Sequence, residues 1–130
     1  MADATTSALV LFAHGARDPQ WGEPFEAIRQ SVAKRCRDLT VEVAFLELMQ
    51  PDLAECVAKL VHRGHGTITI APLFLAQGGH LKQDFPRLVT ELGARYPGVR
   101  ISVLPAIGEV PELLEAIAQW LVAETPRAGR

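Results

Sequence analysis

The stretch SALVLFAHGARDP, residues 7–19, directs the interpretation of the whole chain, because an apolar run ends in it abruptly. Residues 8–13 are apolar throughout, as in a buried strand, and His14, Gly15 and then charged residues follow. In open α/β sheets, ligands bind outside the carboxyl ends of the strands. The stretch therefore predicts a buried strand that places His14 at an edge suited to chemistry.

Apolar runs and helical repeats alternate along the rest of the chain. Three further strands are expected at about residues 41–47, 67–72 and 99–104. Apolar residues also recur every three to four positions, which predicts four helices with apolar stripes at residues 25–39, 53–61, 85–92 and 113–121. Pro51 should begin the second helix, because a missing N–H costs nothing in the first turn. Pro72 should end the third strand.

Four strand–helix units in sequence predict an α/β fold with three layers. We expect a four-stranded, mostly parallel sheet in the order 2-1-3-4, with helices on both faces and right-handed crossovers. The chain has 130 residues, which is the length of one ordinary domain. We therefore assign residues 1–130 to a single domain, with a core at about residues 7–123 and a disordered tail at residues 124–130.

Composition argues against several classes of protein. The chain is 48% hydrophobic and 22% charged with a formal net charge of −2, so we expect no general affinity for nucleic acid. No apolar run approaches the roughly 20 residues of a membrane span, and the N-terminus lacks the basic start of a signal peptide. Cys36 and Cys56 stand alone, and we interpret them as structural thiols in a reducing compartment. A cytoplasmic protein without a membrane partner is expected.

Two further potential ligands follow strands two and three. Glu47 ends the second strand and His80 follows the third, so both would meet His14 at one edge if the strand order is 2-1-3-4. Two imidazoles and a carboxylate suit Co²⁺, Fe²⁺, Ni²⁺ or Zn²⁺. His80 should stand at the start of the third helix, where the positive helix end favours neutral imidazole. Gly78 and Gly79 should let that segment close over a bound molecule.

Plainer interpretations remain open for each of these residues. A histidine at a strand end can be a packing residue, and Glu47 can be a surface carboxylate. His62 and His65 lie at the opposite edge of the sheet and are expected to be surface residues. The chain contains no Walker A, G-x-S-x-G or G-x-G-x-x-G motif, so no nucleotide cofactor is expected.

Three segments, LFAHGARDPQWGEPFE, AFLELMQP and APLFLAQGGHLKQDFP, resemble the small class II chelatases of tetrapyrrole synthesis, in particular the short CbiX-type sirohydrochlorin cobaltochelatases and the related SirB-type ferrochelatases. The resemblance covers about residues 8–108 and depends on the patterns H-G-[SA]-R-D and G-G-H-x-x-x-D-x-P. It implies that His14 and His80 are the family's histidines and that Glu47 is its acidic residue. Ala16 stands where many relatives have serine, which puts a hydroxyl role there in doubt.

The resemblance implies a function: ATP-independent insertion of a divalent metal, with Co²⁺ favoured, into sirohydrochlorin for cobalamin or siroheme biosynthesis. It also implies a homodimer, because the chain has the length of one half of the family's longer members. For the substrate, we expect an apolar floor that includes Leu75 and a cationic rim of Arg17 and Lys82, although Arg17 could instead pair with Asp18 or Asp84. Insertion of Fe²⁺ or Ni²⁺, a non-catalytic metal or tetrapyrrole carrier, and an α/β interaction domain remain alternatives.

Overall fold

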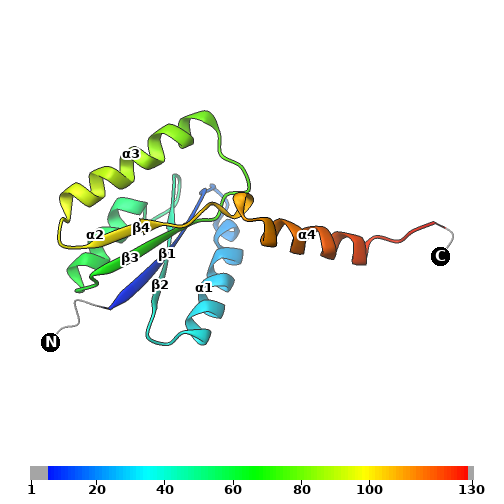
Figure 1. Cartoon of the computed structure of the whole chain (residues 1–130), viewed down its shortest axis with the longest axis horizontal. Helices are drawn as coiled ribbons and strands as arrows, with labels where there is room; N and C mark the ends of the chain where they lie inside the picture. Colours follow the sequence, from blue (N-terminus) through cyan, green and yellow to red (C-terminus); the bar gives the residue numbers. More distant parts are fainter. Residues whose placement is uncertain (1–5, 129–130) are drawn as a thin grey trace.

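The apolar run that opens the chain forms an inner strand of the sheet, as its composition predicts. The computed structural model describes residues 6–128. Its strands pair in parallel in the order β2-β1-β3-β4, which confirms the expected order. Their bounds are β1 (Ser7–Ala13), β2 (Thr40–Phe45), β3 (Thr67–Pro72) and β4 (Arg100–Val103). The strands run in one direction, so their carboxyl ends lie at a common edge (Figure 1).

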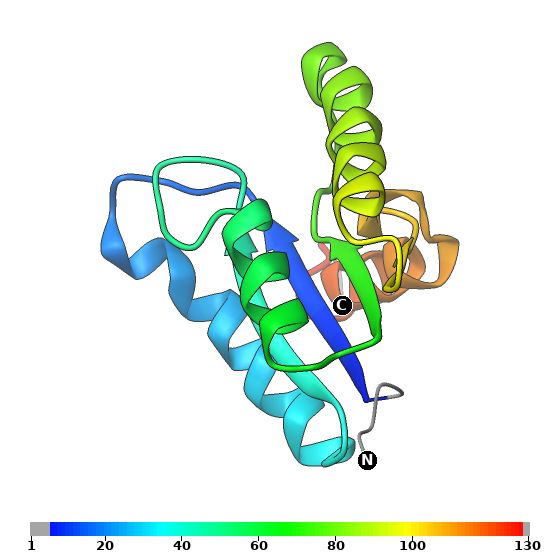
Figure 2. The same cartoon turned by 90° about the vertical axis from the view of Figure 1, so that its left-hand side faces the viewer.

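Helices lie on both faces of the sheet. α1 (Glu23–Arg35) packs on β2 and β1, and α2 (Leu53–His62) and α3 (Gly79–Arg95) lie on the opposite face (Figure 2). The 3-10 helix η1 (Pro19–Gly22) precedes α1, and η2 (Ile107–Glu109) precedes α4 (Pro111–Glu124). The chain crosses from β1 to β2 in one direction, and from β2 to β3 and β3 to β4 in the other. Because crossovers are right-handed, α1 lies on one face of the sheet and α2 and α3 lie on the other.

The main core lies between the sheet and α2 and α3. Its buried side chains come from all these elements and include Val10, Phe12, Ile68, Ile70, Leu53, Val57, Leu60, Leu81, Phe85 and Leu92. The ring of Phe12 lies 5.5 Å from that of Phe74 and 5.2 Å from that of Phe85. Packing of these three rings extends the core beyond the end of β3, to the segment that carries the candidate site.

Three element boundaries differ from those expected. α1 ends at Arg35, so Cys36 and residue Leu39 lie beyond the helix. α2 begins at Leu53 rather than at the proline two residues earlier, because Asp52 caps it: the Asp52 side chain accepts the Glu55 N–H, and Glu55 accepts the Asp52 N–H. β2 ends at residue 45 instead of 47.

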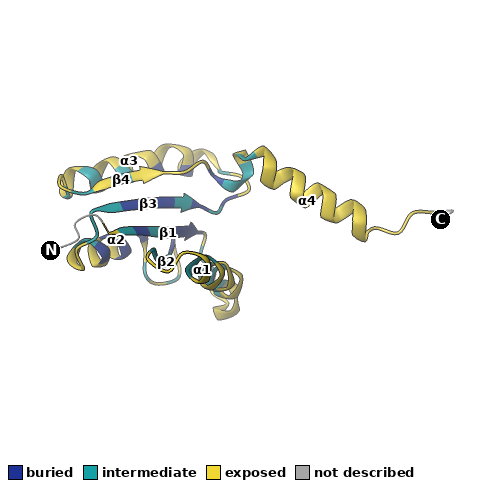
Figure 3. Cartoon of the chain, turned by 60° about the horizontal axis from the view of Figure 1, so that its bottom comes forward, coloured by how far each residue is buried: buried dark blue, intermediate teal, exposed yellow. Residues whose placement is uncertain are grey.

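α4 is the largest departure from expectation. Its apolar stripe predicts a helix that covers the sheet, yet every residue of α4 is exposed, and the helix extends away from the sheet (Figures 1 and 3). α4 includes Glu124, which we expected in a tail, and residues 129–130 of that tail lie outside the described residues. Within residues 6–128, no helix combines the length and apolarity needed to cross a membrane.

Candidate functional site at the carboxyl edge of the sheet

Backbone hydrogen bonds hold the loops that leave the strands close together. Leu46 N donates to Ala13 O and Leu73 N donates to Phe12 O, each at 2.8 Å, so the segments after β2 and β3 remain paired with β1. Leu104 N similarly donates to Ile70 O at 2.9 Å. The first residues that leave β2, β3 and β4 are therefore fixed beside the neighbouring strands by the same ladder that builds the sheet.

His14 is the first residue after β1 and is exposed. Its ring lies 4.7 Å from the ring of Phe74, which is buried. Its carbonyl oxygen accepts a hydrogen bond from Trp21 Nε1 at 2.6 Å. Asp18 helps to place this tryptophan, because its side chain caps η1 by accepting the Gln20 N–H. The His14 backbone is thus held by η1, and its imidazole rests on an aromatic ring.

Glu47 lies directly beside the His14 loop. A Cβ added to Gly15 would stand 1.7 Å from Glu47 O, so only glycine permits this approach of the two backbones. Met49 N donates to Glu47 O at 2.8 Å around Leu48, whose φ is +67°. This bond from residue i+2 to residue i defines a γ-turn, and a positive φ is strained for a bulky side chain. Such strain gathers at functional sites, and here it adjoins the exposed Glu47.

His80 is the second residue of α3, where the sequence predicts it. Leu81 and Phe85 bury the inner side of this first turn, and His80 is exposed. Gly78 is the N-cap with an ordinary φ of −74°, and a Cβ at either Gly78 or Gly79 would meet nothing within 4 Å. The backbone therefore does not require these two glycines, but they leave open space in front of the helix.

The three predicted ligands occupy one edge of the sheet but do not form a ready metal site. Among residues 6–128, no group of three or more His, Cys, Asp or Glu side chains is close enough to hold a metal ion. The chain therefore brings His14 and Glu47 to neighbouring loops and His80 to the first turn of α3, without gathering the three side chains into one ligand set.

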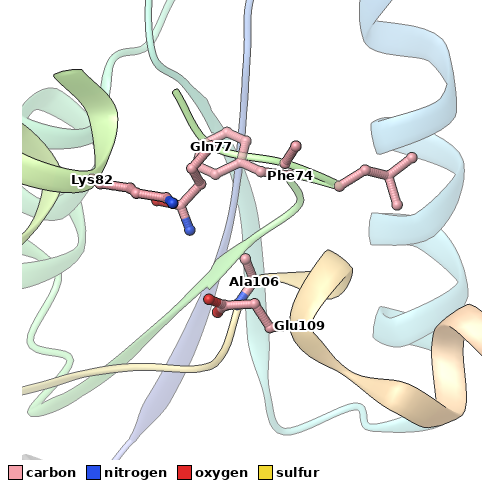
Figure 4. Close-up of a pocket in the computed structure, with 7 residues that line it drawn as sticks. Phe74, Gln77, Lys82, Ala106 and Glu109 are labelled. Atoms are coloured by element: carbon pink, nitrogen blue, oxygen red, sulfur yellow. The ribbon is translucent and has the colours of Figure 1, made fainter. Parts of the chain in front are cut away.

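A pocket of about 220 Å³ opens at the same edge, between the segment after β3, α3 and η2 (Figure 4). Its lining residues are Phe74, Leu75, Ala76, Gln77, Lys82, Ala106 and Glu109. It thus includes Leu75 and Lys82, both predicted to bind substrate, next to the aromatic ring that supports His14. Arg17 does not line this pocket; it is exposed and, within the described residues, forms no ion pair with Asp18 or Asp84.

Sequence reasoning missed three contributors to this edge: Trp21, Glu109 and Gly108. Glu109 Oε1 accepts the Ala106 N–H at 3.2 Å, which turns the carboxylate back toward the pocket. Gly108 N donates to Phe74 O at 3.0 Å, and a Cβ at Gly108 would stand 1.7 Å from Leu75 O. Glu109 lies three residues after Ala106, the N-cap of η2, but alanine has no capping side chain, so the sequence lacks the usual signal for this turn. Nothing in the sequence indicates the Trp21 bond.

Among residues 6–128, the opposite edge of the sheet and the cysteines form no cluster of potential metal ligands. His62 is exposed, as expected, whereas His65 is half-buried. Both cysteines are free. Cys36 is exposed and donates to Asp38 at 3.3 Å, and Cys56 is buried in the core, where burial raises the pKa of its thiol to about 12. The thiol of Cys56 is therefore a packing group, which agrees with the structural role expected for it.

Comparison with known proteins identifies the family. The family model for CbiX matches residues 8–124. A sirohydrochlorin cobaltochelatase of Methanopyrus kandleri is 39% identical over 82 residues, which are 63% of this chain and 57% of that protein. A sirohydrochlorin cobaltochelatase of Saccharolobus islandicus is 30% identical over 102 residues, 75% of this chain and 78% of that protein. A sirohydrochlorin ferrochelatase of Bacillus subtilis is 29% identical over 110 residues, 85% of this chain and 42% of that protein.

Solved structures agree with this assignment. A putative cobalamin biosynthesis CbiX protein from Marinobacter aquaeolei has a TM-score of 0.77 and 33% identity, covering 91% of this chain and 96% of that one. The sirohydrochlorin chelatase SirB of Bacillus subtilis, in complex with cobalt, has a TM-score of 0.75 and 26% identity, covering 92% of this chain and 51% of that one. The chain spans 57% and 42% of the lengths of the first two curated relatives it matches. With a family match across residues 8–124, this chain belongs to the CbiX family.

Proposed function

We propose that this protein inserts a divalent metal ion into sirohydrochlorin without a nucleotide cofactor, with Co²⁺ favoured and Fe²⁺ or Ni²⁺ as alternatives. The observation that carries the proposal is that His14 and Glu47 lie on adjoining loops at the carboxyl edge of the sheet, with His80 in the first turn of the helix that follows β3. The family assignment and the cobaltochelatase and ferrochelatase relatives support it. The reaction would serve cobalamin or siroheme biosynthesis in the cytoplasm.

Metal insertion requires that the ion loses water, that the macrocycle exposes its nitrogen lone pairs, and that two pyrrole protons leave. We assign His14 and His80 to holding the ion and to accepting protons, because imidazole does both near neutral pH. Glu47 would ligate the ion or relay protons. Because no three donors cluster within one chain among residues 6–128, nitrogen atoms of the macrocycle or donors of a second copy would complete the coordination.

The pocket beside His14 suits part of a flat, carboxylate-bearing substrate. Leu75 is 64% exposed and, with Phe74, offers an apolar floor, and Lys82 offers a cation at the rim. Arg17 is exposed near the His14 loop and would contact a second carboxylate. The open space at Gly78 and Gly79 leaves room for the macrocycle in front of α3.

The protein is proposed to act as a homodimer of single chelatase-like domains, each comprising residues 1–130. Its chain spans about half of the longer relatives, and its ligand set is incomplete within residues 6–128. A second copy would supply the other wall of the cleft.

The test compares His80→Ala with His62→Ala, an exposed histidine at the opposite edge. Sirohydrochlorin absorbance is followed after addition of Co²⁺, Fe²⁺ or Ni²⁺, against the uncatalysed reaction. His80→Ala should slow insertion by about 10²-fold or more, the usual contribution of a positioned acid–base group, and His62→Ala should not. Normal turnover by a folded His80→Ala protein contradicts the assignment. Binding of both ligands without acceleration would favour a carrier.

A further inference from the structure

α4 carries an apolar stripe that has no partner within the described residues. Leu113, Leu114, Ile117, Trp120 and Leu121 follow the i, i+1, i+4, i+7, i+8 spacing of one helix face, and their exposed fractions are 43–62%. Glu112, Glu115 and Gln119 lie on the other face together with Val122, and the neighbour that α4 contacts substantially is η2 (Figure 3). An amphipathic helix of this kind is stabilised chiefly by packing of its apolar face, so something must cover this stripe.

One face of the sheet is uncovered over β3 and β4. Side chains alternate along strands, and Ile68 and Ile70 of β3 point into the main core. Thr69 and Ser102 therefore point to the other face, where their hydroxyl oxygens lie 3.5 Å apart. α1 covers β2 and β1 on that face but does not pack substantially on β3 or β4. Parallel sheets are normally covered on both faces, so a helix is missing over β3 and β4.

The chain's own α4 is directed away from this uncovered face. η2 is fixed by the Gly108 N–H bond to Phe74 O and by the burial of Ala106. Val110 alone separates η2 from Pro111, the first residue of α4. Val110 N donates to Ile107 O, and Val110 O accepts from Leu113 N at 3.0 Å. Val110 is therefore hydrogen-bonded both to η2 and to α4. α4 consequently continues beyond the carboxyl edge that carries the candidate site (Figure 1).

We propose that α4 is exchanged between two copies of this chain, so that its apolar stripe covers the open face of β3 and β4 in the partner. A two-fold axis would make the exchange reciprocal and would bring the two carboxyl edges toward each other. Short connections of this kind favour exchange of a terminal element over folding back. The inference deepens the homodimer proposed above and rests on it.

Size and charge both fit a second copy as the occupant. A standard interface uses about 20–30 residues from each partner, and each chain would contribute the 14 residues of α4 together with the face of β3 and β4 that receives the other helix. Of the acidic residues of α4, Glu124 lies seven positions after Ile117 and so on the side of the stripe, and α4 has no basic residue. The receiving face presents Arg100, which is two residues before Ser102 and so shares its face. Because η2 lies between the pocket and α4, the exchange would also place the partner beside Glu109.

The first experiment measures mass by light scattering on the full chain. The wild type should have twice the 14.2 kDa of one chain. Ile117→Glu/Trp120→Glu should halve the mass while the circular dichroism spectrum of the sheet persists. Glu115→Gln, on the polar face, is the matched control and should remain dimeric. A monomeric wild type would overturn both the exchange and the homodimer, and a dimer unaffected by the stripe substitutions would overturn the exchange alone.

The second experiment locates α4 with a short bismaleimide crosslinker in a Cys36→Ser background. Chains carrying Ser102→Cys are mixed with chains carrying Ile117→Cys, and the mixture is unfolded and refolded together. Exchange predicts a crosslinked band of two chains, which a mixture of Glu115→Cys and Ser102→Cys chains should form much more weakly. A third sample is a single chain that carries both Ser102→Cys and Ile117→Cys. If this chain crosslinks within itself and the mixture forms no band of two chains, the proposal is overturned. Neither readout requires metal insertion, so a failure of the proposed chelatase activity would be recorded separately.

Discussion

Gly15→Ala tests whether the close approach of two loops builds the site. The added Cβ would stand 1.7 Å from Glu47 O, and Cβ atoms are essentially never closer than 3.0 Å to such a neighbour. The Glu47 backbone would have to retreat by about 1.3 Å to reach that limit. A misplacement of about 1 Å can cost about 10²-fold in rate, so we expect insertion of Co²⁺ into sirohydrochlorin to slow by about that factor.

The same substitution should also lower stability. Forcing an extra carbon into a packed region costs about 1–3 kcal/mol. For a chain of this size, that corresponds to a fall in Tm of about 4–12 °C, measured by circular dichroism. The matched control is Gly98→Ala, since a Cβ there would meet nothing within 4 Å and the position lies before β4, away from the site. Gly98→Ala should retain both rate and Tm within error.

Two results would refute this reasoning in different ways. A Gly15→Ala protein with the wild-type Tm would show that the contact with Glu47 is not maintained in solution. A Gly15→Ala protein with a lowered Tm but an unchanged insertion rate would show that the spacing of these loops does not matter for the reaction.

Other predictions concern stability and thiol chemistry. Asp52→Ala removes the α2 cap and should lower the free energy of unfolding by about 1 kcal/mol in urea denaturation; an unchanged midpoint would contradict the capping box. Burial raises the pKa of Cys56 to about 12, so its thiol favours the folded state below its usual pKa of about 8.5. That contribution should be lost as pH rises, and the stability difference between wild type and Cys56→Ala should shrink by about 1.4 kcal/mol per pH unit above that value. In native protein a thiol reagent should label the exposed Cys36 quickly and Cys56 only on unfolding; equal rates would contradict this difference in burial.

The sequence predicts the sheet well because its signals are local and strong. Residues 8–13 are apolar without interruption, which is typical of an inner parallel strand. The order 2-1-3-4 was assumed from the common arrangement of short doubly wound sheets, and crossover chirality adds only which face each helix covers. The end of α1 was misjudged because apolar periodicity continues through Cys36 and Leu39, whereas the helix ends at Arg35. Periodicity records which residues avoid water and does not record where the backbone leaves the helical conformation.

The sequence indicated the residues of the candidate site, but it did not indicate the contacts between loops that hold them in place. The strand ends indicated His14 and Glu47, but the contact between Gly15 and Glu47 O depends on two loops that are 32 positions apart. Glu109 lines the pocket only because η2 folds back on the segment after β3. The stripe of α4 predicted a helix packed on the sheet, but the helix is exposed, because a helical pattern cannot specify which molecule provides the other surface.

The hydrogen bond from Trp21 to the carbonyl of His14 also gives the protein a built-in optical reporter. The chain has two tryptophans, and the other is Trp120 on α4. Emission from Trp21 should respond to occupancy beside His14, whereas emission from Trp120 should respond to whatever shields that helix from solvent. Replacing either indole by phenylalanine would separate the two signals, so that ligand titrations and subunit dilution could be followed in one cuvette without an added dye.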